Sequence, residues 1–234
     1  MTPTTIESEK TAKLRHEIKH QIAPREDLVL SGRLKKLFSP DAHAGPNGEY
    51  LVTSLYFDTF ADDALREKLS GLGKRVKFRL RYYGKNPKVL RLEKKEKIGS
   101  LCKKQTAALT LEQAQALLQS DLGFLLDAQE PLCAEFYSRL QGEGLRPKAV
   151  VRYRREAYVY PPGNVRITID RDIRTGVGEA GFFEERLPLP ALQGLSVLEI
   201  KYDAFLPEIV KMAVQVPNRQ AAACSKYALC RRFD

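Results

Sequence analysis

Charged and apolar residues alternate along several strand-like stretches of this sequence, and most of the charges on these stretches are basic. In the stretch 75–82, every second residue is a cation (Arg75, Lys77, Arg79 and Arg81), with apolar or aromatic residues between. Side chains two residues apart on a strand point to the same side, so these cations share one face of a sheet. Like charges at neighbouring same-face positions destabilise a sheet unless an anion lies among them. The alternation therefore predicts either a polyanion-binding face or the solvated face of an ordinary antiparallel sheet.

Acidic residues on these strands also follow a pattern. Glu17, Glu93 and Glu199 each stand two residues before a lysine, so each shares a face with that lysine. If the strands closed into a barrel, their apolar faces would turn outwards against helices and their charged faces would line the inside. A dry interior of unpaired Lys and Arg is too costly, so the inside would be a wet tunnel that binds phosphate chains. Carboxylates among the cations would then suit a hard divalent metal.

Strand signals outnumber helix signals, and the chain contains no long linker and no internal repeat. This pattern favours a β-rich α+β fold with a single domain over residues 14–234, after a flexible polar tail at residues 1–13. Predicted strands lie at 14–22, 50–58, 73–83, 87–97, 148–160, 164–173 and 195–202, with weaker ones at 101–106 and 182–187. Predicted helices lie at 24–38, 60–70, 110–119, 131–142 and 206–215.

The charge balance restricts the partners of the chain. The 39 Lys and Arg against 29 Asp and Glu leave a formal charge of +10, which favours a polyanion. Nucleic acid is the weakest candidate, because single-strand binders interleave aromatic residues with cations and only Tyr153 and Tyr83 do so here. No apolar stretch approaches the roughly 20 residues of a membrane span, and residues 1–13 lack an apolar signal segment. We expect a cytoplasmic protein, with attachment to the inner face of a membrane through a membrane-bound partner left open.

Eight short motifs follow one another along nearly the whole chain, from about residue 14 to 230. In this order they resemble the catalytic domain of vacuolar transporter chaperone (VTC) proteins, a polyphosphate polymerase of the triphosphate tunnel metalloenzyme superfamily. The motifs are Glu17-Ile-Lys19, Ser54-Leu-Tyr-Phe-Asp58, Phe78-Arg-Leu-Arg-Tyr82, Leu92-Glu-Lys-Lys95, Tyr153-Arg-Arg155, Val165-Arg-Ile-Thr-Ile-Asp170, Leu198-Glu-Ile-Lys201 and Ser225-Lys-Tyr227.

The resemblance implies a closed antiparallel eight-stranded β-barrel with helices packed on the outside. A nucleoside triphosphate or polyphosphate would bind in the tunnel with Mn²⁺ or Mg²⁺. Glu199 is the expected main metal ligand, and Glu17 and Glu93 are further candidates or charge partners of nearby cations. Catalytic phosphate contacts are expected from Arg79, Arg81, Lys95, Arg155 and Arg166, and substrate binding from Lys19, Lys97, Tyr153, Lys201, Ser225 and Lys226.

The expected reaction is transfer of the γ-phosphoryl group of a nucleoside triphosphate, ATP in the first place, to a growing phosphate chain. The attacking phosphate oxygen is already anionic, so no general base is required. A tripolyphosphatase or nucleoside triphosphatase of the same fold is the first alternative. Hydrolytic members typically carry E-x-E-x-K in the first strand, whereas Arg15 stands at the first of these positions here. A non-catalytic polyphosphate-binding protein is the second alternative.

Overall fold

The computed structural model describes residues 15–85, 87–99, 101–185, 187, 189–216 and 224–231, so the expected tail at 1–13 lies outside the described residues. Its main strands are β1 (His16–Ile22), β3 (Glu49–Asp58), β4 (Lys74–Tyr83), β5 (Val89–Ile98), β6 (Leu101–Thr110), β7 (Arg146–Tyr160), β8 (Val165–Val177) and β10 (Ser196–Tyr202). They form one antiparallel sheet in the order β1-β10-β8-β7-β3-β4-β5-β6. Two short strands, β2 (Ser39–Pro40) and β9 (Leu189–Pro190), pair with β7 and β8. The α+β class is therefore confirmed.

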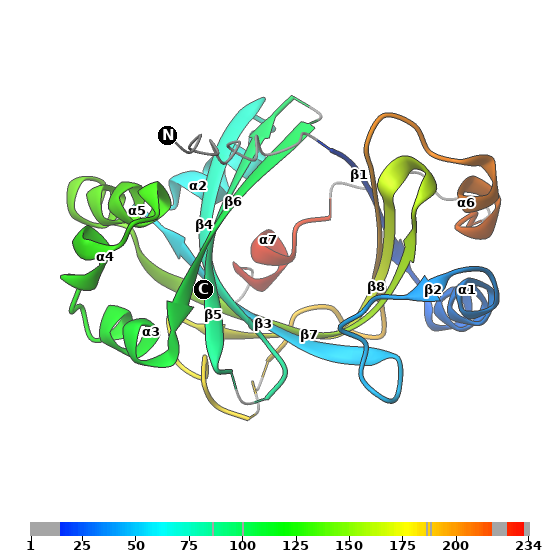
Figure 1. The fold of residues 1–234 in the computed structure, drawn as a ribbon, viewed down its shortest axis with the longest axis horizontal. Coiled ribbons are helices and arrows are strands. Elements are labelled where there is room, and N and C mark those ends of the chain that lie inside the picture. The colour runs from blue at the N-terminus through cyan, green and yellow to red at the C-terminus, as the bar shows by residue number, and fades with distance from the viewer. Residues whose placement is uncertain are drawn as a thin grey trace, which may run out of the picture.

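The sheet curls into a channel, but its two edges do not pair along their length (Figure 1). Among the described residues, the edge strands β1 and β6 meet in one isolated bridge, between Arg15 and Cys102. The seven-residue β1 meets the ten-residue β6 only at this end, so no continuous ladder of hydrogen bonds joins them. The expected closed barrel is therefore not confirmed, and the channel has an open seam.

Helices cover two separate parts of the outer surface of the sheet (Figure 1). One group, α3 (Leu111–Leu118), α4 (Phe124–Asp127) and α5 (Pro131–Gly142), packs over β4, β5 and β6. The other group, α1 (Pro24–Leu37) and α6 (Glu208–Ala213), packs over β8 and β10. The apolar strand positions predicted to face outwards form the two cores beneath these helices. None of the helices in the described part of the chain is long and apolar enough to cross a membrane.

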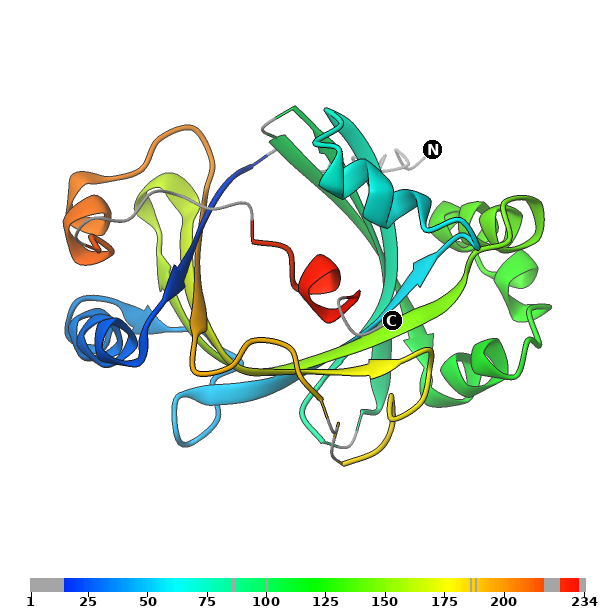
Figure 2. The same cartoon turned by 180° about the vertical axis from the view of Figure 1, so that it is seen from behind.

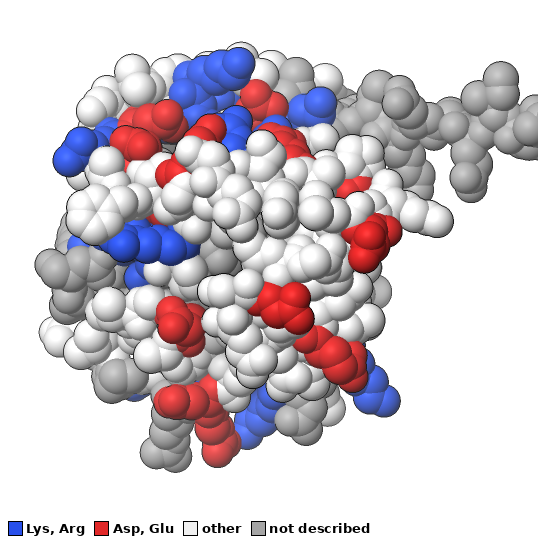
Figure 3. All heavy atoms as spheres, turned by 90° about the vertical axis from the view of Figure 1, so that its left-hand side faces the viewer, with Lys and Arg blue, Asp and Glu red and all other residues white. Residues whose placement is uncertain are grey.

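The outer face that carries α3–α5 has no continuous basic patch. Uncharged and acidic side chains are spread over it, and Lys and Arg form only small separate groups (Figure 3). The excess positive charge of the chain is therefore not displayed on this face, which agrees with apolar and acidic positions being turned outwards here.

One helix lies inside the ring of strands. Views from both sides place α7 (Lys226–Cys230) within the channel (Figures 1 and 2). Its Tyr227 and Leu229 belong to a buried cluster with Val52 and Val151, which lie on the inner faces of β3 and β7. The expectation that all helices pack outside is thus wrong for α7. The reason is that the inner face of the sheet is apolar at these positions, and α7 removes that surface from water.

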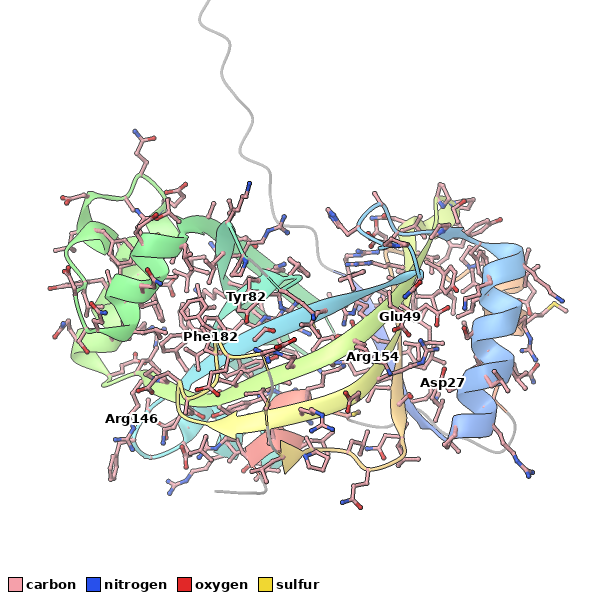
Figure 4. The ribbon with its side chains drawn as sticks, turned by 90° about the horizontal axis from the view of Figure 1, so that it is seen from below. Asp27, Glu49, Tyr82, Arg146, Arg154 and Phe182 are labelled. Carbon is pink, nitrogen blue, oxygen red and sulfur yellow. The ribbon has the colours of Figure 1, made fainter. Side chains whose placement is uncertain are left out.

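The weak strand expected at 182–187 is a loop instead. Phe182 in this loop packs edge-on against Tyr82 at 5.2 Å between ring centres, and the Tyr82 hydroxyl donates to the Phe182 carbonyl at 2.6 Å (Figure 4). Gly181 has a φ of 78°, and a Cβ there would lie 2.5 Å from Leu187. The tight turn at Gly181 interrupts the extended conformation that a strand would need.

Candidate functional site

A cavity of about 460 Å³ lies inside the ring of strands and carries a large excess of positive charge. Among the described residues of its lining, fifteen are Lys or Arg and two are Glu. Of the fourteen site residues expected from the sequence, Glu93 alone is not part of the lining and is fully buried in the wall. The other thirteen line the cavity: Glu17, Lys19, Arg79, Arg81, Lys95, Lys97, Tyr153, Arg155, Arg166, Glu199, Lys201, Ser225 and Lys226.

Arg79 and Arg81 lie side by side on the inner face of β4 and are held from below by neighbouring strands. The Arg79 guanidinium donates to the Tyr56 hydroxyl at 3.0 Å, and Arg81 Nε donates to Ser54 Oγ at 2.9 Å. Both acceptors come from β3, which is paired with β4 in a register that puts Tyr56 opposite Arg79 and Ser54 opposite Arg81. These contacts fix two fork-shaped donors towards the cavity, the geometry that suits bidentate phosphate binding.

Glu93 serves as the buried counter-charge of this arginine pair. Its Oε2 lies 2.6 Å from Arg79 Nη2 and 3.8 Å from Arg81 Nη1, and its Oε1 lies 2.5 Å from Lys104 Nζ. Burial by itself would raise the pKa of Glu93, but the three cations outweigh it and lower the pKa well below its usual range. This carboxylate is therefore ion-paired with arginine and lysine and lies apart from the other glutamates of the cavity.

Glu17 and Glu199 face each other across one lysine. Lys19 Nζ lies 2.9 Å from Glu17 Oε1 and 3.3 Å from Glu199 Oε2, and the other oxygens are paired with Lys95 and Lys201 at 2.7 and 2.6 Å. Against burial and the repulsion from Glu199, these lysines lower the pKa of Glu17 to about 2. Against burial, Lys201 and Lys19 likewise hold the pKa of Glu199 well below its usual range. Both carboxylates are therefore ionised at neutral pH.

This pair fits the divalent metal that the family resemblance implies. Two ionised carboxylates meet at one point, where the Lys19 ammonium now provides the positive charge. Mg²⁺ and similar hard cations are commonly held by one or two carboxylates together with substrate phosphates. Among the described residues, no group of three or more His, Cys, Asp or Glu could hold a metal. Glu17 and Glu199 thus fit as ligands, whereas Glu93 is not brought into the same group.

A second arginine–carboxylate pair supports the far wall. Arg155 Nε and Nη2 donate to the two Asp170 oxygens at 2.7 and 2.8 Å, and Lys226 Nζ lies 2.6 Å from Asp170 Oδ2. The Tyr153 ring centre lies 5.1 Å from each of these cations. Arg155 therefore faces the cavity, and the Tyr153 ring makes cation–π contacts with Arg155 and Lys226. Ser225 caps α7 by accepting a hydrogen bond from Ala228 N, which positions Lys226 in the cavity.

Several residues in or beside the cavity were not among the site residues predicted from the sequence. Asp58 accepts a 2.6 Å hydrogen bond from the Tyr227 hydroxyl and so ties α7 to the end of β3. Lys77 Nζ lies 4.6 Å from the Tyr227 ring centre. Burial, together with repulsion from neighbouring cations and against the attraction of Asp58, lowers the pKa of Lys77 to about 7. The alternation of charged residues at 75–81 places Lys77 on the same face as Arg79 and Arg81, so the sequence pattern could have indicated it. Lys104 lies in the stretch 101–106, where the strand signal is weak.

Comparison with known proteins gives one family and a set of related folds. The model of the VTC domain family matches residues 14–233. A Hippeastrum protein named as an adenylyl cyclase and described with a dominant triphosphatase activity is similar in structure, with a TM-score of 0.53 and 15% identity over 94% of this chain and 96% of that chain. A Pyrococcus horikoshii OT3 protein has a TM-score of 0.49 and 12% identity over 94% of this chain and 99% of that chain. No curated protein sequence matches the chain significantly.

Proposed function

This chain belongs to the VTC domain family, which confirms the resemblance seen in its motifs, and on that premise we propose that it is a metal-dependent polyphosphate polymerase. The proposed reaction transfers the γ-phosphoryl group of a nucleoside triphosphate, ATP in the first place, to the end of a phosphate chain. The observation that carries the proposal is the cavity whose described lining holds fifteen cations and two glutamates. A phosphate chain is the kind of ligand that relieves the repulsion among so many cations.

The residues around the cavity have different roles in the proposed phosphoryl transfer. The transition state of this reaction is loose, so the protein chiefly positions the phosphates and neutralises their charge. Arg79 and Arg81 are oriented for the transferred group, and Arg155 and Lys226 hold neighbouring phosphates from the far wall. Glu17 and Glu199 would hold Mn²⁺ or Mg²⁺, which supplies charge neutralisation on phosphate oxygens when bound.

The state of the carboxylates supports a phosphate nucleophile over water. A general base that activates water works best with a pKa near the working pH. The pKa of Glu17 is lowered to about 2, with burial opposing and lysines favouring the ionised form, and that of Glu199 is lowered as well. Both are therefore weak bases. A terminal phosphate oxygen is already anionic and needs no such base.

A triphosphatase that uses the same cavity is the second candidate. It draws support from the related fold of the Hippeastrum protein, which is described with a dominant triphosphatase activity. Both candidates need the same cations, and they differ in whether a phosphate chain end or water takes the phosphoryl group.

Incubation of the purified protein with ATP and Mn²⁺, followed by gel separation of the products, tests the proposal. A ladder of phosphate chains is the expected result. Inorganic phosphate without a ladder would replace the polymerase by the triphosphatase. If ATP stays unchanged and neither ATP nor inorganic polyphosphate binds, the chain is not a phosphate-chain enzyme.

A further inference from the structure

The two mouths of the tunnel carry different side chains. Arg75 and Tyr83 mark opposite ends of the inner face of β4, eight residues or about 27 Å apart along the strand. The first end, here the basic mouth, consists of Lys68, Arg75, Lys97 and Lys103, none of which is ion-paired within the described ranges. The second end, here the aromatic mouth, consists of His43, Tyr50 and Tyr83.

Tyr83 stands at the centre of the aromatic mouth, with a partner on either side. The Arg91 guanidinium lies 5.5 Å from its ring centre, and the His43 ring lies nearly parallel to it at 6.4 Å and 16°. Arg91 comes from β5 and His43 from the loop before β3, and these strands flank β4 on opposite sides. Arg91 and His43 therefore approach Tyr83 from opposite sides.

The separation of His43 and Tyr83 differs from that of the other histidine–tyrosine stack. His16 and Tyr202, which lie opposite each other on β1 and β10, are stacked at 5.1 Å. Carbon atoms in contact are about 3.5 Å apart, so a planar ring between two others needs about 7 Å. At 6.4 Å, His43 would have to move only slightly to accept a third ring against Tyr83.

The loop that carries His43 is held at both ends. Asp41 Oδ1 accepts from the backbone N–H of His43 at 2.9 Å, and Asp41 Oδ2 lies 2.6 Å from Arg166 Nη2. At the other end, Glu49 is paired with Arg171 at 2.7 Å. His43 itself is exposed between these anchors. The loop is therefore fixed in position while the histidine ring remains free to adjust.

The aromatic mouth lies at a suitable distance from the arginine pair. Tyr83 follows Arg81 by two residues on the same face, about 7 Å along the strand. Arg166 lines the cavity at this mouth, and its buried Nε has no hydrogen-bond partner among the described residues. A nucleotide with its terminal phosphates at Arg79 and Arg81 would bring its sugar towards Arg166 and its base towards Tyr83.

We propose that the aromatic mouth binds the base of the nucleoside triphosphate, with the base stacked between the Tyr83 and His43 rings. This inference rests on the proposed function and adds the substrate class: a purine nucleoside triphosphate, bound in preference to the same triphosphate without a base. Purines are favoured because the larger ring covers more of both aromatic faces. The four residues that define the basic mouth offer only charge.

Equilibrium binding of ATP and of ribose 5-triphosphate, which differs from ATP only in lacking the base, tests this proposal. Both are titrated calorimetrically with EDTA present, so that metal-dependent turnover is suppressed. The wild-type protein should bind ATP about tenfold more tightly, the size expected for one stacked base. His43→Ala should abolish this preference and leave ribose 5-triphosphate binding unchanged. His43→Phe keeps a ring and should retain the preference.

His16→Ala is the matched control, since it removes the other histidine–tyrosine stack, that of His16 on Tyr202 between β1 and β10, and it should keep the preference for ATP. Equal binding of both ligands by the wild-type protein would overturn the base site and leave the phosphate tunnel intact. Equal weakening of both ligands by His43→Ala would also overturn it, since His43 would then act on phosphate or on the loop. If neither ligand binds to the wild-type protein, the proposed function fails as well.

Discussion

Two clusters of buried charge in this protein are built from the same residue types and differ in their balance. In the tunnel, cations far outnumber carboxylates. On the outer surface beneath α1, the outer network consists of Asp27, Glu49, Glu156, Arg154 and Arg171 (Figure 4). Arg171 alone contacts three of its carboxylates, at 2.5 to 2.7 Å. The outer network is thus close to neutral, while the tunnel is not.

The difference in balance separates a structural cluster from a binding cluster. Burial opposes the charge of both partners, but the carboxylates of the outer network raise the pKa of Arg171, and hydrogen bonds lower the pKa of Asp27 and Glu156. The arginines and carboxylates of the outer network are paired with one another, and these pairs connect α1 to the sheet. Several tunnel cations are also paired with carboxylates, but the cations are in excess, and among the described residues Lys68, Arg75, Lys97 and Lys103 have no ion pair, so the tunnel keeps positive charge for an anion. Charge balance, more than residue type, indicates which cluster binds a ligand.

Replacement of Arg81 by methionine gives the largest expected effect. Glu93 keeps Arg79 and Lys104, and repulsion between Arg79 and Arg81 is relieved, so the fold should keep its stability. Loss of one oriented donor to a charged transition state costs about 100- to 1,000-fold in rate. We expect that loss in ATP turnover, with an unchanged melting temperature. A matching loss in Arg174→Met, which replaces a half-buried arginine of β8 that does not line the cavity, would contradict a specific role of the tunnel.

Replacement of Glu199 by glutamine removes one charge from the pair that fits a metal. We expect metal-dependent ATP turnover to fall by at least about 100-fold, because a divalent cation supplies several kcal/mol of charge stabilisation. Without metal, tripolyphosphate should bind at least as tightly as to the wild-type protein, since the tunnel gains net positive charge. Turnover and melting temperature are measured on the same sample. Near wild-type turnover would remove Glu199 from the mechanism.

Replacement of Arg171 by methionine should produce the opposite pattern. It removes a cation that is paired with three carboxylates of the outer network. We expect this loss to lower the free energy of unfolding by about 3 kcal/mol. Urea denaturation measures this loss, and Arg174→Met, which removes a half-buried arginine of the same strand with one ion pair at the surface, should lower the free energy of unfolding by no more than about 1 kcal/mol. Tripolyphosphate affinity of the folded Arg171→Met protein should be unchanged. A loss of affinity equal to that of Arg81→Met would erase the distinction between the clusters.

The smallest expected effect is a pH dependence from Lys77. Burial, together with repulsion from Arg75, Lys68 and Lys95 and against the attraction of Asp58, lowers the pKa of Lys77 to about 7 from its ordinary value of 10.5. Between these values the unfolded chain binds the proton and the folded chain does not, so this group makes stability rise with pH. Phosphate binds the protonated form, so its contribution to tripolyphosphate affinity falls with pH.

The two pH slopes are measured by urea denaturation and by titration calorimetry between pH 7 and 9. The difference between the wild-type protein and Lys77→Met isolates this one group from the others that titrate in the range. We expect affinity to fall up to about tenfold in the wild-type protein relative to Lys77→Met. Parallel slopes for the two proteins would mean that Lys77 stays charged in the ligand-free tunnel.

Much of the fold and of the candidate site could be predicted from local pattern. The period of two along β4 assigns Arg79 and Arg81 to one face whatever the rest of the chain does. The seven main predicted strands and five predicted helices agree closely with the structure. At 152–155, however, three arginines crowd together, and a one-residue slip would exchange their faces. In the structure β7 pairs with β3 in unbroken register over these residues, so Arg155 meets Asp170 inside the tunnel and Arg154 meets Glu49 outside it.

The sequence by itself determined which side chains share a face, because the pleat of a strand fixes side-chain direction over two residues. Only the tertiary structure decided which face meets which partner. The pairing of Arg155 with Asp170, of Glu93 with Lys104 and of Arg171 with Asp27 depends on strand register and helix packing. The place of α7 inside the channel depends on apolar inner positions of other strands. Such contacts join residues far apart in the chain, and no local period records them.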